Sequence, residues 1–288
     1  EIDTVRGMTG SEMREHVLAR HVVLATGRDG LGGPAVPEIA ESLPRERWAH
    51  SSDENDYAQL RGKRVAVIGA GASAMDSAGT ALEAGAASVD LLIRRRDIPR
   101  INRGKGMGHP GSIAGYRHLP DAWKWRINSY IAREQVPPPR ASVLRVSRHP
   151  NAFFRQGTAL ISARMEGDEI VVETSAGTMR FDFMIFSTGF KVDWGSRPFL
   201  KEIAACARNW VDRGVPEDAE PSLGAMPDLG PGFEFQPKVP GTYPGLERIH
   251  CFCYPAALSH GTVSGDIPAI SDGAERLSQA IASRLFRE

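Results

Sequence analysis

One stretch of sequence decides the fold of this chain: Arg64-Val65-Ala66-Val67-Ile68-Gly69-Ala70-Gly71-Ala72-Ser73-Ala74. Its β-branched residues favour a buried strand, and the strand runs directly into the pattern G-x-G-x-x-A. Gly69 allows a tight turn, Gly71 lets the backbone approach a pyrophosphate, and Ala74 lets the following helix pack close to the sheet. We expect that helix over residues 73–84. Its first N–H groups, beginning at Ser73, would hold phosphate oxygens.

The residues after this helix indicate which dinucleotide is bound. A second strand is predicted over residues 88–93, so strand, turn, helix and strand follow within about 30 residues, as in dinucleotide-binding units. An acidic residue at the end of this strand would bind the 2′-hydroxyl of NAD. The chain has Arg94, Arg95 and Arg96 instead, and a guanidinium suits a 2′-phosphate. We therefore predict NADP. The alternatives are an ordinary glycine-rich turn and a solvated basic turn.

Composition limits the class of protein and its partners. The 288 residues are 41% hydrophobic and 24% charged, which is typical of one large or two medium globular domains. Basic and acidic residues number 35 each, so overall charge indicates neither a nucleic-acid nor a membrane partner, and no apolar run approaches a membrane span. Cys206, Cys251 and Cys253 form no C-x-x-C pair and have no metal-ligand spacing, so we interpret them as inert thiols. We expect a cytoplasmic protein with a small-molecule substrate and no metal, and leave homo-oligomerisation open.

The rest of the chain is predicted as short elements. We expect a Gly- and Pro-rich connection over residues 28–47 and a glycine-rich loop over the cofactor at residues 100–120. Trp123, Trp125 and Tyr130 either line a substrate cavity or, as we favour, include the core positions of an amphipathic helix. Strands are predicted at 13–27, 143–146, 159–163, 169–173, 183–186 and 249–252, and helices at 121–134, near 198–209 and within 266–285.

The order of these motifs resembles the flavin-containing monooxygenases. The resemblance covers nearly the whole chain and rests on Ala25-Thr26-Gly27, His50-Ser51, the glycine motif with Asp76, and the stretch from Asp182 to Phe190. In such flavoproteins an FAD-binding unit opens the chain, an NADPH domain is inserted, and the chain then returns to complete the FAD domain. The resemblance thus implies an α/β fold with a Rossmann-like NADP-binding domain inserted in an incomplete FAD-binding domain.

The resemblance also implies domain boundaries. Residues 1–27 would end the first FAD segment, residues 28–182 would form the NADP-binding domain, and residues 183–288 would form the returning FAD segment. The chain carries one glycine fingerprint, whereas the family's FAD fingerprint would lie upstream. The sequence is therefore either a fragment or a protein that has lost the flavin site, and we expect a fragment.

Further site residues follow from the resemblance. Thr26, Gly27, Thr188 and Gly189 would shape the crossings between the two domains. Asp266, near the last helix, would approach the flavin ring, with a plain helix cap as the alternative. His50 would help to position NADP or is a satisfied surface histidine.

The function implied by the resemblance is that of an FAD- and NADPH-dependent monooxygenase. NADPH would reduce FAD, and one oxygen atom of O2 would enter a nitrogen, sulfur or ketone substrate. No catalytic residue can be assigned from the sequence. The alternatives are an NADPH reductase of the thioredoxin-reductase-like superfamily without redox cysteines and a non-catalytic NADP-binding module.

Overall fold

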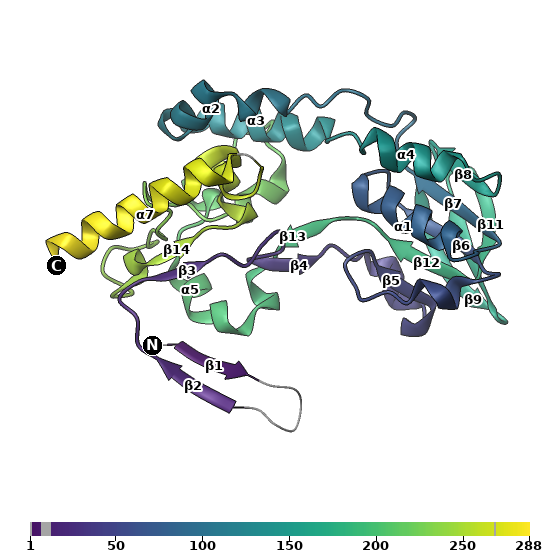
Figure 1. Cartoon of the computed structure of the whole chain (residues 1–288), viewed down its shortest axis with the longest axis horizontal. Coiled ribbons are helices and arrows are strands. Elements are labelled where there is room, and N and C mark those ends of the chain that lie inside the picture. The colour runs from purple at the N-terminus through teal and green to yellow at the C-terminus, as the bar shows by residue number, and fades with distance from the viewer. Residues whose placement is uncertain (1, 7–12, 268) are drawn as a thin grey trace. The chain divides into compact units, whose positions relative to one another are not determined.

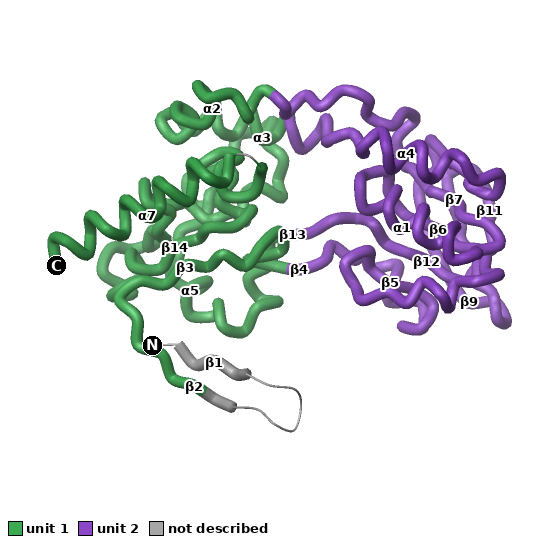
Figure 2. The backbone as a smooth tube through the Cα atoms, in the orientation of Figure 1, with its two compact units in different colours: residues 1–32, 106–130, 192–288 green, residues 33–105, 131–191 purple. Residues whose placement is uncertain are grey.

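The computed structural model describes residues 2–6, 13–267 and 269–288 of the chain. It divides into two compact units, each assembled from separate segments (Figure 1, Figure 2). Unit 1 comprises residues 1–32, 106–130 and 192–288, and unit 2 comprises residues 33–105 and 131–191. The chain changes unit at β4 (Gly32–Pro34) and β13 (Phe190–Val192), which pair with each other. It also changes unit between residues 105 and 106 and within α3 (Asp121–Glu134).

Unit 2 is built on a parallel sheet of five strands. In spatial order these are β5 (Trp48–His50), β12 (Phe183–Phe186), β6 (Arg64–Ile68), β7 (Ser88–Ile93) and β8 (Ala152–Gln156). Every neighbouring pair in this sheet is parallel. After β6 the chain adds β7 and β8 on one side of it and then returns to place β12 on its other side, so the strand order reverses between β6 and β12.

The two faces of this sheet are covered differently. Val65 and Val67 of β6 pack against the helices α1 (Ala72–Glu83) and α4 (Arg140–Ser147). Ala66 and Ile68 point to the opposite face, because side chains alternate along a strand. That face is covered by an antiparallel sheet of β9 (Leu160–Glu166), β10 (Glu169–Thr174) and β11 (Gly177–Phe181). The α/β fold with a parallel sheet is as predicted.

The prediction of a strand at residues 143–146 is wrong. These residues lie within α4, which begins after the extended Pro139. Val143 and Val146, one helical turn apart, both contact the cluster that contains α1, and Arg145 donates a 2.8 Å hydrogen bond to Glu83 at the end of that helix. Four residues are too few to distinguish a repeat of two from a repeat of three to four, so tertiary packing decided the outcome.

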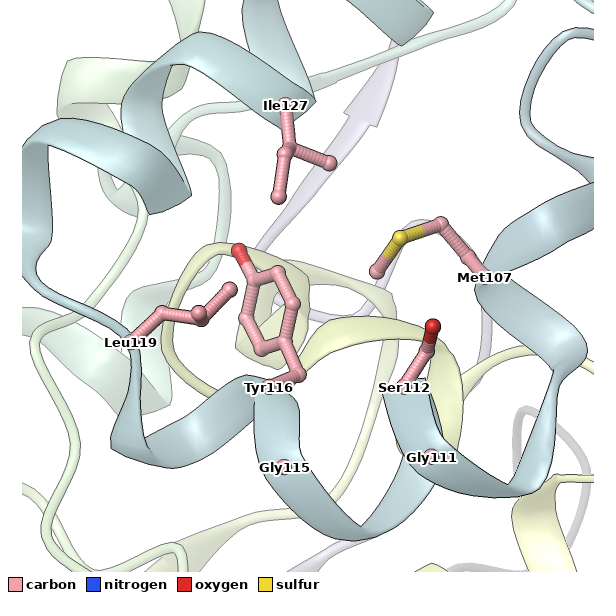
Figure 3. Close-up of a pocket in the computed structure, with 7 residues that line it drawn as sticks. All are labelled: Met107, Gly111, Ser112, Gly115, Tyr116, Leu119 and Ile127. Carbon is pink, nitrogen blue, oxygen red and sulfur yellow. The ribbon is translucent and has the colours of Figure 1, made fainter.

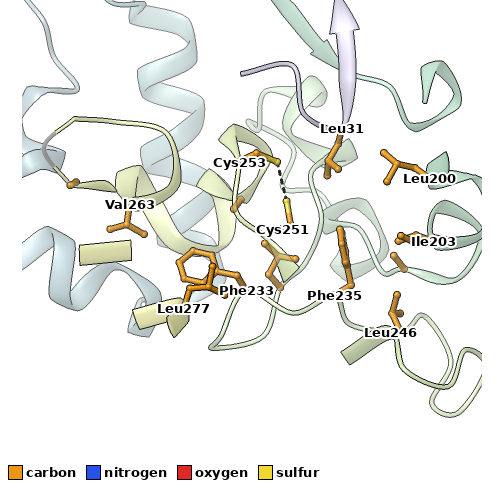
Figure 4. Packing of buried hydrophobic residues seen from close by; sticks show 14 residues of the cluster. Leu31, Leu200, Ile203, Phe233, Phe235, Leu246, Cys251, Cys253, Val263 and Leu277 are labelled. Carbon is orange, nitrogen blue, oxygen red and sulfur yellow. Dashed lines mark hydrogen bonds between the residues drawn. The ribbon is translucent and has the colours of Figure 1, made fainter. Parts of the chain in front are cut away.

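Unit 1 contains a short parallel pair of strands and several helices around its own core. β3 (Val22–Leu24) pairs with β14 (Ile249–Cys251), and β1 (Ile2–Arg6) pairs antiparallel with β2 (Met13–Val17). The helices are α2 (Pro110–Gly115), the first part of α3, α5 (Lys201–Cys206), α6 (Ala257–His260) and α7 (Ile270–Arg287). The core between them is rich in large apolar side chains, including Phe233 and Phe235 (Figure 4).

Two further predictions about elements are corrected here. Residues 13–27 do not form one strand, because β2 and β3 belong to different sheets and Leu18 between them is 80% exposed. Residues 100–120 are not a plain loop but contain α2, for which His109 is the N-cap and Pro110 the first residue. The predicted helix at 121–134 is confirmed, and Trp125 on it is a core residue that packs edge-on against Trp210.

The compact units differ from the expected domain boundaries in three segments: residues 28–32 and 106–130 lie in unit 1, and residues 183–191, which include β12, lie in unit 2. Residues 106–130, which we expected to be part of the nucleotide domain, pack within unit 1, because the buried Tyr116 donates a hydrogen bond to the carbonyl of Leu258 in that unit. Among the described residues, no helix combines the length and the apolar character needed to cross a membrane.

Candidate nucleotide-binding site

The turn between β6 and α1 forms a cradle of exposed backbone. Gly69 has φ +134°, and a Cβ added to it would lie 2.6 Å from the carbonyl oxygen of Ser187, so no larger residue fits there. Gly71 is the N-cap of α1, and a Cβ added to it would meet no heavy atom within 4 Å. One glycine is therefore required by the protein itself, whereas the other leaves open space in front of the helix.

The N-terminus of α1 supplies hydrogen-bond donors to this space. No side chain caps the helix, and the first intrahelical bond runs from the N–H of Met75 to the carbonyl of Gly71. The preceding N–H groups, including that of Ser73, point out of the helix with the positive end of its dipole. Ser73 is exposed, whereas Ala74 is 1% exposed and lets the helix lie close to the sheet. This donor set and the space beside it fit a phosphate group.

The cradle lies at the carboxyl edge of the parallel sheet, where the strand order reverses. Gly69 follows β6, Ser187 follows the adjacent β12, and His50 ends β5. The N–H of Ser187 donates to the carbonyl of Ile68, and the N–H of Gly69 donates to the carbonyl of Leu92. Ligands of open α/β sheets bind at such a reversal, so the geometry independently selects the turn that the motif selects.

The three arginines directly follow β7 at the same edge, but they are not equivalent. Arg94 and Arg96 are exposed. Arg95 is half-buried and donates to the carbonyl of Arg133, while its own carbonyl accepts a 2.8 Å hydrogen bond from the N–H of Gly157. Two of the guanidinium groups are thus free to turn toward a phosphate, and the third holds the chain after the strand.

His50 is buried rather than on the surface, with 1% of its area exposed. Its Nδ1 accepts a 3.2 Å hydrogen bond from the N–H of Ser52, so the proton of the neutral ring is on Nε2. Burial lowers the pKa of this imidazole, and its ring packs edge-on against Phe190. The alternative of a satisfied surface histidine is therefore wrong. Among the described residues, Nε2 has no hydrogen-bond partner.

The two Thr-Gly turns are built alike but belong to different units. In unit 2 the hydroxyl of Thr188 donates to the carbonyl of Ala35 at 2.7 Å, and Gly189 has φ +80°. In unit 1 the hydroxyl of Thr26 donates to the carbonyl of Gly30 at 3.1 Å, and Gly27 has φ +85°. Each turn thus ends a parallel strand with a left-handed glycine and a threonine that holds the returning backbone.

Asp266 belongs to unit 1, whereas the cradle at Gly69 belongs to unit 2. It is exposed, and its carbonyl accepts a hydrogen bond from the N–H of Ile270, the first residue of α7. The N-cap of that helix is Ala269, so the alternative of a helix-capping aspartate is wrong. Ser187, by contrast, was not among the predicted site residues. Its position directly before Thr188-Gly189 is the signal that could have identified it.

A cavity of about 230 Å³ lies within unit 1 between α2 and α3 (Figure 3). Met107, Leu119 and Ile127 give it an apolar lining around the ring of Tyr116, and Ser112 adds a hydroxyl group. Burial raises the pKa of the Tyr116 phenol, which remains neutral. The lining contains no carboxylate, ammonium or guanidinium group, so the cavity suits a small apolar group. No cluster of metal-ligating side chains occurs in the described part of the chain.

Comparisons of the sequence place the chain beside known enzymes. The model of the L-lysine 6-monooxygenase/L-ornithine 5-monooxygenase family matches residues 2–105. Over 273 residues the chain is 37% identical to an FAD-dependent urate hydroxylase from Xanthomonas campestris pv. campestris. The match covers 94% of this chain and 58% of the hydroxylase, so the chain spans somewhat more than half the length of that relative.

Solved structures of low sequence identity share the fold. An ornithine hydroxylase from Pseudomonas aeruginosa aligns with a TM-score of 0.69 and 18% identity over 98% of this chain and 67% of that chain. An ornithine N-hydroxylase from Kutzneria sp. 744, solved with reduced FAD, NADP+ and L-ornithine, aligns with a TM-score of 0.65 and 17% identity over 98% of this chain and 68% of its own. The fold is thus that of the two-dinucleotide-binding flavoprotein monooxygenases. The predicted resemblance to flavin monooxygenases is confirmed.

Proposed function

We propose that unit 2 binds NADPH and that the chain works as part of an FAD-dependent monooxygenase. The observation that carries this proposal is the cradle of Gly69, Gly71 and the uncapped α1 at the reversal of strand order, with Arg94 and Arg96 at the next strand end. The relationship to flavin monooxygenases supports FAD as the second cofactor.

The proposed roles follow from what each group offers. Gly69, Gly71, Ser73 and Ala74 would admit the pyrophosphate to the helix N-terminus. Arg94 and Arg96 would bind the 2′-phosphate as paired N–H donors, while Arg95 positions the segment that carries them. Bound FAD would supply the redox chemistry of the reaction, namely hydride acceptance and O2 activation. His50 would shape the same strand end as a neutral ring, because its burial disfavours the charged form.

The domain assignment also rests on the proposal that the chain is part of an FAD- and NADPH-dependent monooxygenase. Residues 28–182 would form the NADP-binding domain, except that residues 28–32 and 106–130 lie in unit 1. Residues 1–27 and 183–288 would form segments of the FAD-binding domain, except that residues 183–191, which include β12, lie in unit 2, and the Thr26-Gly27 and Thr188-Gly189 turns would lie at the crossings. Gly27 leaves open space where a Cβ would stand, so a bound group could approach this turn, and Asp266 would face the flavin side.

The substrate class is proposed from the relatives. Urate, lysine and ornithine appear in the names of the related enzymes, so we propose a small nitrogen-containing substrate. The balanced charge of the chain supports no nucleic-acid partner. The three free cysteines in the described residues support a reducing, cytoplasmic location.

The proposal is tested first by measuring nucleotide binding and then by recording the flavin absorption spectrum. The chain should bind NADPH at least tenfold more tightly than NADH in a fluorescence titration, and the variant Arg94→Ala/Arg96→Ala should lose that preference. The natural protein that contains this sequence should show a flavin absorption spectrum and should consume O2 with NADPH. A colourless protein that still binds NADPH would support the non-catalytic module instead.

A further inference from the structure

Two thiols meet in the core of unit 1. Cys251 ends β14 and Cys253 follows two residues later, so both side chains leave the extended backbone on the same side. Their sulfur atoms are 3.5 Å apart, and the residues are 0% and 1% exposed. A dashed line in Figure 4 marks this contact. The sequence alone predicts inert thiols, because the chain has no C-x-x-C pair and no metal-ligand spacing. The structure instead makes a dithiol.

We propose that Cys251 and Cys253 are an oxidisable pair, which a small peroxide converts into a disulfide within the chain. A disulfide needs sulfur atoms about 2.05 Å apart and Cα atoms no more than about 6.8 Å apart. Two residues of extended strand span about 6.6 Å, which is near that upper limit. The sulfur atoms therefore need to approach by about 1.5 Å, which side-chain rotation and a small backbone shift can supply.

The surroundings indicate which sulfur reacts first. The hydrogen bonds with the Cys251 thiol and the Thr26 hydroxyl lower the pKa of Cys253, whereas burial raises the pKa of Cys251. The Cys253 thiolate is thus the nucleophile. It attacks one oxygen of the peroxide, the O–O bond breaks, and water or an alcohol leaves with a proton, giving a sulfenic acid. Cys251 then attacks that sulfur, the S–O bond breaks, and water leaves with the Cys251 proton. Two electrons pass from the thiols to the peroxide.

Oxidation of the pair would change the packing of the neighbouring Thr26-Gly27 turn. A Cβ added to Gly30 would lie 2.6 Å from both the Cys253 sulfur and the Thr26 hydroxyl, so these three groups are in close contact. The N–H of Tyr254 also approaches the carbonyl of Gly27, at 3.4 Å. Drawing the Cys253 sulfur toward Cys251 loosens this contact. Only this consequence for a flavin-side crossing depends on the proposed function, and the thiol chemistry does not.

The test is peroxide treatment of the folded chain, followed by alkylation, trypsin and mass spectrometry. Both cysteines lie in one tryptic peptide, residues 249–276. We expect this peptide to lose two hydrogens with hydrogen peroxide and to regain them with dithiothreitol. A bulky aromatic disulfide reagent should react poorly, because both sulfur atoms are buried. Cys206→Ser is the matched control and should form the same disulfide.

The order of attack has its own test. In Cys251→Ser the reaction should stop at a sulfenic acid on Cys253, which dimedone labels, whereas Cys253→Ser should show at least tenfold less labelling at Cys251. Thermal unfolding of both variants shows that they fold. The proposal is overturned if Cys251 and Cys253 remain fully alkylatable at a peroxide dose that oxidises Cys206. It is also overturned if both sulfurs are oxidised separately without linking. NADPH binding has no part in these measurements, so failure of the proposed function leaves this result readable.

Discussion

In both units backbone turns follow the ends of parallel strands, but the residues and the space at these turns differ. In unit 2, the turn after β6 leaves open space at Gly71 and continues at once into a helix whose N-terminus is uncapped. In unit 1, Cys253 and Tyr254 follow β14, and Cys253 packs tightly against Gly30. Backbone turns at the ends of parallel strands therefore occur in both units and do not by themselves make a phosphate site. A phosphate cradle also needs an empty space and a helix N-terminus directly behind the turn.

The largest expected effect comes from closing the cradle of unit 2. Gly69→Val should destabilise the fold by about 3 kcal/mol or more and abolish NADPH binding, because its Cβ meets the Ser187 carbonyl and its φ is positive. Gly71→Ala is the control that separates the two glycines. It should leave the thermal unfolding temperature nearly unchanged, because its Cβ meets no atom, yet weaken NADPH binding in a fluorescence titration. If Gly71→Ala binds NADPH as tightly as the parent, the cradle is not the phosphate site.

The next effect concerns the basic end of β7. Arg94→Ala and Arg96→Ala should each weaken NADPH binding about tenfold, or about 1.4 kcal/mol, and leave NADH binding unchanged. Arg95→Ala should change the NADPH-to-NADH preference least, because its guanidinium is already held by the carbonyl of Arg133. Isothermal calorimetry with both nucleotides measures this. Equal losses for NADPH and NADH would remove the 2′-phosphate assignment.

Acidification should weaken unit 1 through His260. Its Nε2 donates to the carbonyl of Gly230 at 3.0 Å, its ring stacks on Phe233 at 3.9 Å, and burial lowers its pKa to about 3. Since the unfolded chain protonates this ring near pH 6.5 and the folded chain does not, stability should fall as pH drops below 6.5. The loss approaches about 1.4 kcal/mol per pH unit and ends near pH 3.

The variant His260→Gln cannot take up this proton, so its unfolding free energy should depend less steeply on pH by about one proton. Urea unfolding at pH 7, 6 and 5, followed by tryptophan fluorescence, measures the slope. This signal reports mainly on unit 1, where four of the five tryptophans lie. An unchanged slope in the variant would show that His260 takes no part in the acid sensitivity.

The smallest expected effect is at the packed strand end of unit 1. Gly30→Ala should cost about 1 kcal/mol of stability, because its Cβ would overlap the Cys253 sulfur and the Thr26 hydroxyl. Adding Cys253→Ala should recover part of this loss by removing the sulfur, and NADPH affinity should stay unchanged in both variants. Chemical denaturation of the parent, the single variants and the double variant gives the coupling free energy between residues 30 and 253. A Gly30→Ala variant that is as stable as the parent would contradict the close packing.

Elements whose signals lie within one contiguous segment were predicted correctly from the sequence. The strand, turn and helix from Arg64 to Glu83 are contiguous, and so these elements could be predicted without knowing their neighbours in space. The helix at 121–134 was predicted on the same basis. The prediction of a strand at residues 143–146 failed because a short apolar run fits both the two-residue repeat of a strand and the repeat of three to four residues of a helix. Packing against α1 made this segment helical.

The sequence by itself determined the nucleotide motif and the arginines that follow the second strand, because these depend on spacing along one chain segment. It also determined the kinship with flavin monooxygenases, which depends on the order of short motifs along the chain. Only the tertiary structure decided that Ser187 closes on Gly69, that Arg95 is engaged elsewhere, that His50 is buried, and that Cys253 meets Gly30 and Thr26. These contacts join residues far apart in the sequence. Their distances depend on how strands are ordered in a sheet, which no local pattern encodes.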